Sequence, residues 1–196
     1  PRAPEDAAEQ MRRAVARHEG LFGSKPRGCW PSEGSVSAGT VSVLADAGIE
    51  WCATDEEILA ATLSRSGKKM RLDGPDRADI LYHAYRVGPD EKPVKVVFRD
   101  HYLSDLIGFT YYTYEPKKAA ANFVNHLHRI ADLAAKKGPG RWIVPVILDG
   151  ENPWEAYADG GLVFLRELYG LLSVSRKVRT TRICDYLENV EPEPLG

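Results

Sequence analysis

Short apolar runs alternate with amphipathic segments along most of the chain, and this alternation predicts the order of its elements. The apolar runs predict strands at 27–30, 49–53, 94–98, 142–148 and, more weakly, 179–184. Apolar residues at helical spacing predict helices over 37–47, 54–63, 116–137 and 161–172. Alanines and charged residues with little apolar face predict another helix over 4–19. Strands that alternate with helices in this way are typical of an α/β protein with a parallel sheet.

For three of these helices the sequence also predicts the start or the residues that face the core. Thr54 with Glu57 three residues later predicts a capping box at the start of the third helix. The longest helix has an apolar face, and the last helix has another. The inward residues predicted for them are Phe123, Leu127, Ile130, Leu133 or Ala134, and then Leu162, Leu165, Tyr169 and Leu172.

Other segments predict irregular backbone. Pro145 removes a ladder donor from the run at 142–148, so we expect a bulge or a local irregularity there. The polar, glycine-rich range 64–79 predicts a surface excursion, and the proline- and glutamate-rich tail at 188–196 predicts a connecting loop.

Composition narrows the function classes. The 196 residues are 43% apolar, enough for one sizeable core, and the net charge of −2 gives no reason to expect nucleic acid or an anionic membrane as partner. Three cysteines without a CxxC spacing favour a reducing, cytoplasmic compartment. The chain begins with Pro1, so we interpret it as the interior of a longer protein, and a signal peptide upstream is not excluded. The apolar run at 142–148 is too short to span a membrane.

Acidic residues follow four of the predicted strands, where parallel α/β folds build their sites. They are Glu33, Asp55, Asp100 with its neighbours Arg99 and His101, and Asp149 with Glu151. Trp30 and Trp154 lie close by and offer flat faces of the kind that pack on sugar rings. Two carboxylates brought together by folding are the minimum needed to cleave a glycosidic bond, and Glu33 and Asp149 are the strongest pair.

Each of these residues has a simpler interpretation. Glu33 can cap the following helix with Trp30 in the core, and Asp149 can be a turn residue before Gly150. Spacing cannot separate Asp149 from Glu151, because alternate residues of an extended segment point the same way.

Two other functions stay open at this point. A metal site of His101, Asp100 and Asp55, as in barrels that deacetylate polysaccharides, lacks the usual ligand spacing. A non-catalytic carbohydrate-binding barrel would keep the tryptophans without turnover. The tyrosines at 111, 112 and 114 could line a glucan groove or simply pack a loop.

Four blocks of sequence carry a resemblance to a known family. They are GCWPSEGSVS, AGIEWCATDEEIL, FRDHYLSDLIGF and VILDGENPWEAYADGGLVFLRELY. Together they resemble the catalytic core of glycoside hydrolase family 57. The resemblance implies an incomplete seven-stranded (β/α) barrel and retaining activity on α-glucans, as hydrolase or glucanotransferase, with no cofactor or metal. The family's His-Gln-Pro motif and late tryptophan-rich block are absent, so we expect 1–196 to be the central part of one barrel domain whose first and last strands lie outside it.

The resemblance also implies roles for individual residues. The Trp-x-x-Glu block makes Glu33 the nucleophile, and the Asp-Gly-Glu block makes Asp149 the general acid/base. The expected partners are an α-glucan or oligosaccharide and the remaining barrel strands. The expected substrate contacts are Trp30, Asp55, Arg99, Asp100, His101, Asp105, Glu151 and Trp154.

Overall fold

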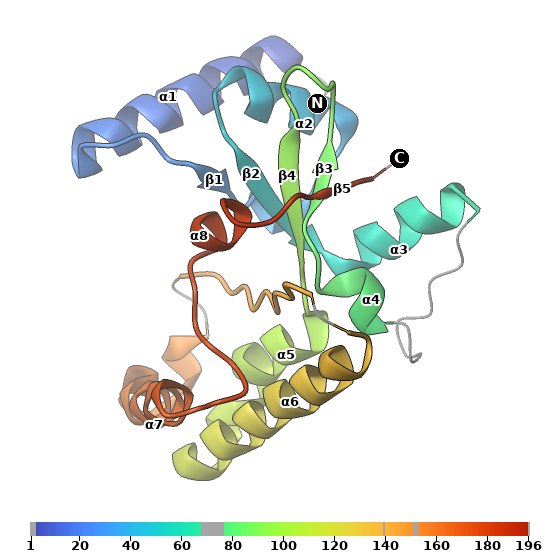
Figure 1. Cartoon of the computed structure of the whole chain (residues 1–196). Helices are drawn as coiled ribbons and strands as arrows, with labels where there is room; N and C mark the ends of the chain where they lie inside the picture. The colour runs from blue at the N-terminus through green and yellow to red at the C-terminus, as the bar shows by residue number, and fades with distance from the viewer. Residues whose placement is uncertain (1–2, 68–76, 139, 151–152, 196) are drawn as a thin grey trace. The chain divides into compact units, whose positions relative to one another are not determined.

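The chain forms two compact units in the computed structural model, which describes residues 3–67, 77–138, 140–150 and 153–195 (Figure 1). The first unit consists of Pro1–Met70, His83–Phe98 and Ile183–Gly196. The second consists of Arg71–Tyr82 and Arg99–Arg182. Each unit therefore contains segments that are far apart in the sequence.

The first unit is built on a five-stranded sheet with the order β1-β2-β4-β3-β5. The strands are β1 Gly28–Cys29, β2 Trp51–Asp55, β3 Tyr85–Val87, β4 Val94–Arg99 and β5 Glu193–Pro194. β1 runs parallel to β2 and β5 runs parallel to β3, but β3 is antiparallel to β4. The α/β class is confirmed, whereas the expectation of a purely parallel sheet is wrong. A six-residue connection joins β3 to β4 as a hairpin, which reverses the chain without a crossover helix.

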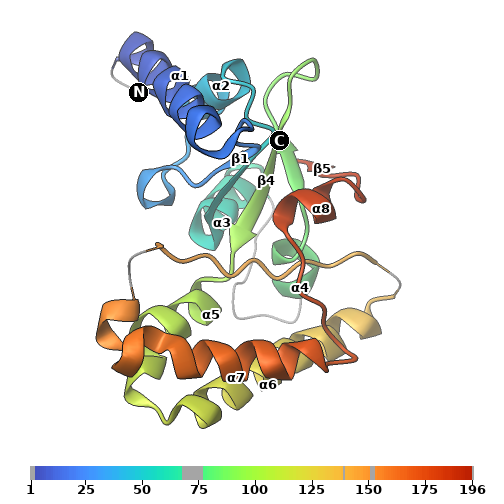
Figure 2. The same ribbon diagram turned by 90° about the vertical axis from the view of Figure 1, so that its left-hand side faces the viewer.

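The described residues of this unit form four α-helices. They are α1 Pro4–Phe22, α2 Ala38–Asp46, α3 Glu56–Arg65 and α8 Ile183–Leu187. α1 lies beside α2 (Figure 2) and buries none of its residues, as its weak apolar face predicted. The core includes Leu44 from α2, Leu59 from α3 and Phe98 from β4, each at most 1% exposed.

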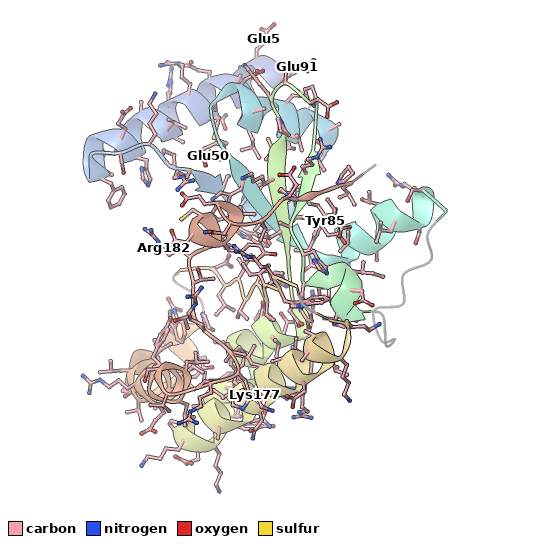
Figure 3. The ribbon with its side chains drawn as sticks, viewed as in Figure 1. Glu5, Glu50, Tyr85, Glu91, Lys177 and Arg182 are labelled. Atoms are coloured by element: carbon pink, nitrogen blue, oxygen red, sulfur yellow. The ribbon has the colours of Figure 1, made fainter. Side chains whose placement is uncertain are left out.

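Salt bridges and hydrogen bonds connect the C-terminal segment to the sheet. Arg27 pairs with Glu50 (labelled in Figure 3) at 2.8 Å and with Glu188 at 2.6 Å. The Lys95 Nζ donates to the Leu187 carbonyl at 3.0 Å. The predicted connecting loop at 188–196 therefore contains a strand, β5, and the predicted strand at 179–184 is wrong. Residues 179–182 have no regular structure, and α8 begins at Ile183.

The second unit is helical. Its α-helices are α4 Arg77–Leu81, α5 His101–Asp105, α6 Pro116–Lys136 and α7 Leu162–Ser173. Short helical turns join them: η2 Leu106–Thr110, η3 Tyr111–Thr113, η4 Trp154–Ala156 and η5 Ala158–Gly161. α6 and α7 pack along one another, and the Lys177 ammonium (labelled in Figure 3) pairs with Asp132 of α6 at 2.6 Å.

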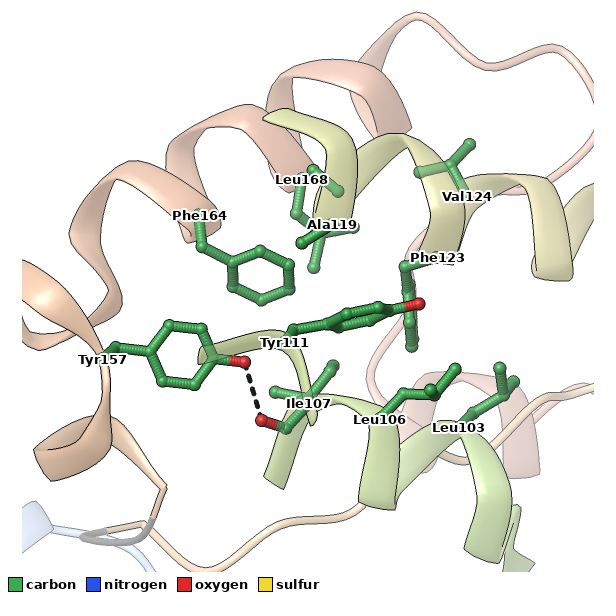
Figure 4. Close-up of a cluster of buried hydrophobic side chains, with 11 residues drawn as sticks. Leu103, Leu106, Ile107, Tyr111, Ala119, Phe123, Val124, Tyr157, Phe164 and Leu168 are labelled. Carbon is green, nitrogen blue, oxygen red and sulfur yellow. Dashed lines mark hydrogen bonds between the residues drawn. The ribbon is translucent and has the colours of Figure 1, made fainter. Parts of the chain in front are cut away.

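Aromatic rings fill the core of this unit (Figure 4). Tyr111 contacts Phe123 of α6 and Phe164 of α7, and the Tyr157 hydroxyl donates to the Ile107 carbonyl at 2.7 Å. Burial raises the pKa of Tyr157 to about 12, so its hydroxyl stays protonated as a donor at neutral pH.

The inward faces of the two long helices differ in part from the prediction. On α7 the buried residues are Phe164 and Leu168, whereas Tyr169 is 60% exposed and Leu162 48% exposed. Leu165 and Leu172 are partly buried, because α6 packs against the side of α7 that carries Phe164. On α6 the predicted Phe123 and Ala134 are buried, Leu127 and Ile130 are partly buried, and Leu133 is 52% exposed.

The predicted strand at 142–148 is extended but pairs in no regular ladder. Its alternate residues Val144, Val146 and Leu148 pack against the aromatic core. The predicted irregularity at Pro145 is present, and it extends over the whole run. The predicted excursion at 64–79 is described only at its ends, where α3 ends at Arg65 and α4 begins at Arg77; residues 68–76 lie outside the described residues.

A substitution at Gly28 tests the packing of the first unit. A Cβ at this position would lie 2.0 Å from Cε2 of Trp51 on the neighbouring strand. We therefore expect Gly28→Ala to lower the free energy of unfolding by about 1–3 kcal/mol, measured by urea denaturation. Gly20→Ala in α1 is the control, since its Cβ would meet nothing within 4 Å. It should be neutral or stabilise by up to about 1 kcal/mol, and equal destabilisation by both would contradict the packing argument.

Candidate active site

The candidate residues are divided between the two units. Trp30, Glu33 and Asp55 belong to the first, and Arg99, Asp100, His101, Asp105, Asp149 and Trp154 belong to the second. Glu151 lies outside the described residues.

Glu33 lies in a single helical turn, η1 Ser32–Gly34, which is separated from the end of β1 by two residues. Its backbone is left-handed, with φ 54° and ψ 23°, and Gly34 follows with φ 65°. A residue with a Cβ pays about 1–3 kcal/mol for a sparsely populated backbone conformation, so surrounding contacts must hold it. The side chain is exposed to solvent. The simpler interpretation of Glu33 as a helix cap does not apply, because Ser37 caps the following helix α2.

Three contacts hold the Glu33 turn. The Gly34 N–H donates to the Pro31 carbonyl at 2.9 Å, and the indole of Trp30 packs so closely that a Cβ on Gly34 would lie 2.8 Å from its Cη2. From the neighbouring strand, the buried Thr54 hydroxyl donates to the Gly34 carbonyl at 2.6 Å. The strained backbone therefore keeps Glu33 directed to solvent from a fixed support.

Thr54 has a different role from the predicted one. β2 continues through Asp55, so it is Asp55 that caps α3, with its Oδ1 accepting from the Glu57 N–H at 3.0 Å. Thr54 lies within the strand, 1% exposed, where its hydroxyl reaches the Glu33 turn. Residue type alone could not show which of the two residues caps α3, because the side-chain oxygen of either Thr54 or Asp55 can accept from a helix N–H.

In the second unit, three predicted residues meet where β4 passes into α5. The Arg99 Nη2 lies 3.3 Å from His101 Nδ1, and the His101 Nε2 lies 2.9 Å from Asp105 Oδ2. Arginine can only donate, so Nδ1 accepts and Nε2 carries the proton that His101 donates to Asp105. Arg99 also pairs with Asp105 at 3.5 Å. The cluster is partly exposed, with 41% of the His101 side chain accessible, so it can offer both donors and acceptors to a ligand.

Unlike the partly exposed cluster of Arg99, His101 and Asp105, Asp100 is buried, with 2% of its surface exposed. Its Oδ1 accepts from the Leu103 N–H at 2.8 Å and caps α5. Its Oδ2 accepts from the Tyr82 hydroxyl at 2.6 Å and pairs with Arg77 at 3.1 Å. Protein donors thus occupy both oxygens. Tyr82 and Arg77 carried no signal in the sequence pattern, since neither belongs to a motif.

Asp149 follows the extended segment 142–148 and is exposed. Trp154 lies in η4 and is half-buried, with its ring centroid 5.5 Å from that of Tyr157. Gly161, at φ 78°, lies against this ring, since a Cβ there would be 2.6 Å from Trp154 Cε3. Gly161 and Tyr157 therefore restrict the orientation of the Trp154 indole.

Two further properties of the described residues bear on function. Within residues 3–67, 77–138, 140–150 and 153–195, no group of three or more His, Cys, Asp or Glu could hold a metal ion. No helix in the same ranges combines the length and apolar character needed to cross a membrane.

Comparison with known proteins identifies the family. The family model described as glycosyl hydrolase family 57 matches residues 2–195. The chain belongs to this family. No curated protein matches it in sequence.

Two solved structures resemble this family 57 chain. One is the 4-alpha-glucanotransferase from Thermococcus litoralis, with a TM-score of 0.70 and 20% identity over 97% of this chain and 27% of that chain. The other is the alpha-amylase AmyC from Thermotoga maritima, with a TM-score of 0.75 and 14% identity over 98% of this chain and 46% of that chain. These likenesses confirm the α/β fold class, and the chain spans less than half the length of either protein.

Thr54 offers a test of the support under Glu33. Thr54→Val keeps the shape but leaves the buried Gly34 carbonyl without the hydroxyl donor. We expect it to lower the free energy of unfolding by about 1–3 kcal/mol in urea denaturation. The control Thr62→Val removes a hydroxyl that bonds only within its own helix, to Ile58, and should change stability by less than about 0.5 kcal/mol. Similar effects of the two substitutions would show that the Thr54 hydroxyl is not needed.

Proposed function

We propose that this chain carries both catalytic carboxylates of a retaining glycoside hydrolase or glucanotransferase that acts on α-glucans, with Glu33 as nucleophile and Asp149 as general acid/base. The observation that carries the proposal is the family match over 2–195, which spans both turns. The names of the two similar structures, a glucanotransferase and an alpha-amylase, support the substrate class.

The local structure around Glu33 suits a nucleophile. Attack on an anomeric carbon requires a carboxylate oxygen held in one direction and open to the substrate. Glu33 is exposed, and its backbone is fixed by the Trp30 ring and the Thr54 hydroxyl. Strained residues held by their surroundings are concentrated at active sites, which adds to this assignment.

The proposed reaction has two steps. Glu33 attacks the anomeric carbon while the bond to the leaving oxygen breaks, and Asp149 gives that oxygen its proton. Asp149 then takes a proton from water as the water oxygen attacks the same carbon, and the Glu33 carboxylate leaves. A sugar hydroxyl in place of water makes the enzyme a transferase, with the same residues in the same roles.

The other candidates would bind the sugar. Arg99, His101 and Asp105 form a partly exposed polar cluster that can donate to and accept from sugar hydroxyls. We assign Trp30 and Trp154 to stacking on ring faces, and Asp55 and Glu151 to further polar contacts. The burial of Asp100 favours a supporting role over direct contact.

The two carboxylates can be tested by isosteric substitution in the complete protein. Glu33→Gln and Asp149→Asn should each lower kcat/KM on a maltooligosaccharide by about 10²–10⁴-fold, because each removes a group that acts in the transition state. Glu57→Gln and Glu155→Gln are matched controls, since both are exposed carboxylates close in sequence to the two sites, and they should keep full activity. Wild-type rates for Glu33→Gln or Asp149→Asn would reject the assignment.

The stereochemistry of the product tests the mechanism separately. A glycosyl-enzyme on Glu33 requires carboxyl groups about 5–5.5 Å apart and gives a product that retains the α configuration. We expect the first product seen by proton NMR during maltooligosaccharide cleavage to be the α anomer, before mutarotation. An initial β anomer would point to inversion and to a separation of about 6.5–9.5 Å.

A further inference from the structure

The segment that leads to Asp149 forms hydrogen bonds with three residues outside it, Tyr82, Asp100 and Ser104. The Ile143 N–H donates to the Tyr82 carbonyl at 3.0 Å, and the Asp100 N–H donates to the Pro145 carbonyl at 2.8 Å. The Ile147 N–H donates to the Ser104 hydroxyl oxygen at 3.2 Å. The bonded residues alternate, so one edge of the segment is fixed at regular intervals. Pro145 fits because this arrangement uses only its carbonyl.

Asp100 connects the other two of these residues, Tyr82 and Ser104, to each other. Its carboxylate accepts from the Tyr82 hydroxyl and from the Leu103 N–H at the start of α5. Its carbonyl accepts from the Ser104 hydroxyl at 2.7 Å, and this same hydroxyl oxygen receives the Ile147 N–H. Asp100 is 2% exposed and Ser104 is fully buried, so the network works away from water, where such bonds are strongest.

The charge of the network is balanced at Asp100. Arg77 pairs with its Oδ2 at 3.1 Å and lies 21% exposed, which compensates the burial of the carboxylate. Burial and the neighbouring Asp100 charge raise the pKa of Tyr82 well above its usual range. The Tyr82 hydroxyl therefore stays protonated at neutral pH and donates to Asp100.

We infer that Asp100, Tyr82 and Ser104 are positioning residues that set the place of Asp149 along the 142–148 segment and so determine how well it protonates the leaving oxygen. The inference rests on the proposed role of Asp149 as general acid. No regular sheet ladder holds this segment, so these three bonds, together with the packing of Val144, Val146 and Leu148, help to set its register. A shift of about 1 Å in a catalytic group can reduce a rate by about 10²-fold.

The choice of leaving group separates positioning from general damage. Cleavage of a maltooligosaccharide needs the acid, because the departing sugar oxygen is a poor leaving group, whereas maltosyl fluoride releases fluoride with little need for protonation. The value of kcat/KM reports the glycosylation step for both substrates. A misplaced acid lowers it for the oligosaccharide alone, while a partly unfolded enzyme loses both activities equally.

The experiment compares Tyr82→Phe and Ser104→Ala with Tyr111→Phe in the complete protein. Tyr111→Phe is the matched control, because it removes a hydroxyl bond of 2.7 Å in the same unit, and the partner of that bond is Asn122 of α6, which makes none of the three bonds to the segment. We expect the first two to lower kcat/KM on maltooligosaccharide about tenfold or more while changing that on maltosyl fluoride less than about threefold. Tyr111→Phe should change kcat/KM on either substrate less than about threefold.

The variant Asp149→Asn distinguishes a failure of the positioning inference from a failure of the proposed catalytic role of Asp149. If Asp149→Asn shows strong selectivity for the fluoride and Tyr82→Phe and Ser104→Ala show none, the positioning inference is overturned and Asp149 keeps its role. If Asp149→Asn loses no activity on either substrate, the proposed function itself fails. Equal losses on both substrates in Tyr82→Phe and Ser104→Ala would assign these residues to stability alone and also overturn the inference.

Discussion

Several elements of the second unit depend on the ion pair and hydrogen bonds of one buried carboxylate, that of Asp100. A carboxylate taken out of water is costly unless donors surround it, and here Arg77, Tyr82 and the Leu103 N–H all point to it. These donors come from α4 and the residue after it and from α5, so satisfying one charge brings these elements together at the end of β4. The extended segment then attaches to the same point through the backbone of Asp100.

The two proposed catalytic carboxylates are supported by the same physical device in different surroundings. A fully buried hydroxyl, that of Thr54 or Ser104, bonds to backbone where no sheet partner is available. In the Glu33 turn it helps to hold a left-handed residue, and in the Asp149 segment it replaces one rung of a ladder. A buried hydroxyl finds its partner or costs free energy, so each of these bonds restricts the adjacent chain to one conformation. A buried hydroxyl thus bonds to the backbone close to each of the two exposed carboxylates.

The sequence pattern predicted most accurately the elements whose stability is local. The helices at 4–19, 37–47 and 116–137 were predicted within a few residues, because proline starts, a serine cap and helical spacing act over one or two turns. It failed for β3 and β5, which are two or three residues long and exist only because β4 offers an edge for β3. It also mistook the buried face of α7, where the position of α6 decides which apolar residues are covered. The run at 142–148 was predicted as a strand with a local irregularity at Pro145, whereas the whole run lacks a ladder.

For the candidate site, residue types and short motifs name Glu33, Asp149, the tryptophans and the Arg99–His101–Asp105 group as candidates. Acidic residues at strand ends and the family's blocks are properties of the chain itself. The sequence could not separate Asp55 from Thr54 as the cap, nor Asp100 from its exposed neighbours as a buried support. Those distinctions depend on which side chains face inward and which distant donors meet them. Tyr82 and Arg77 reach Asp100 from about twenty residues away, and only the packing of α4 against α6 and the end of β4 brings them there.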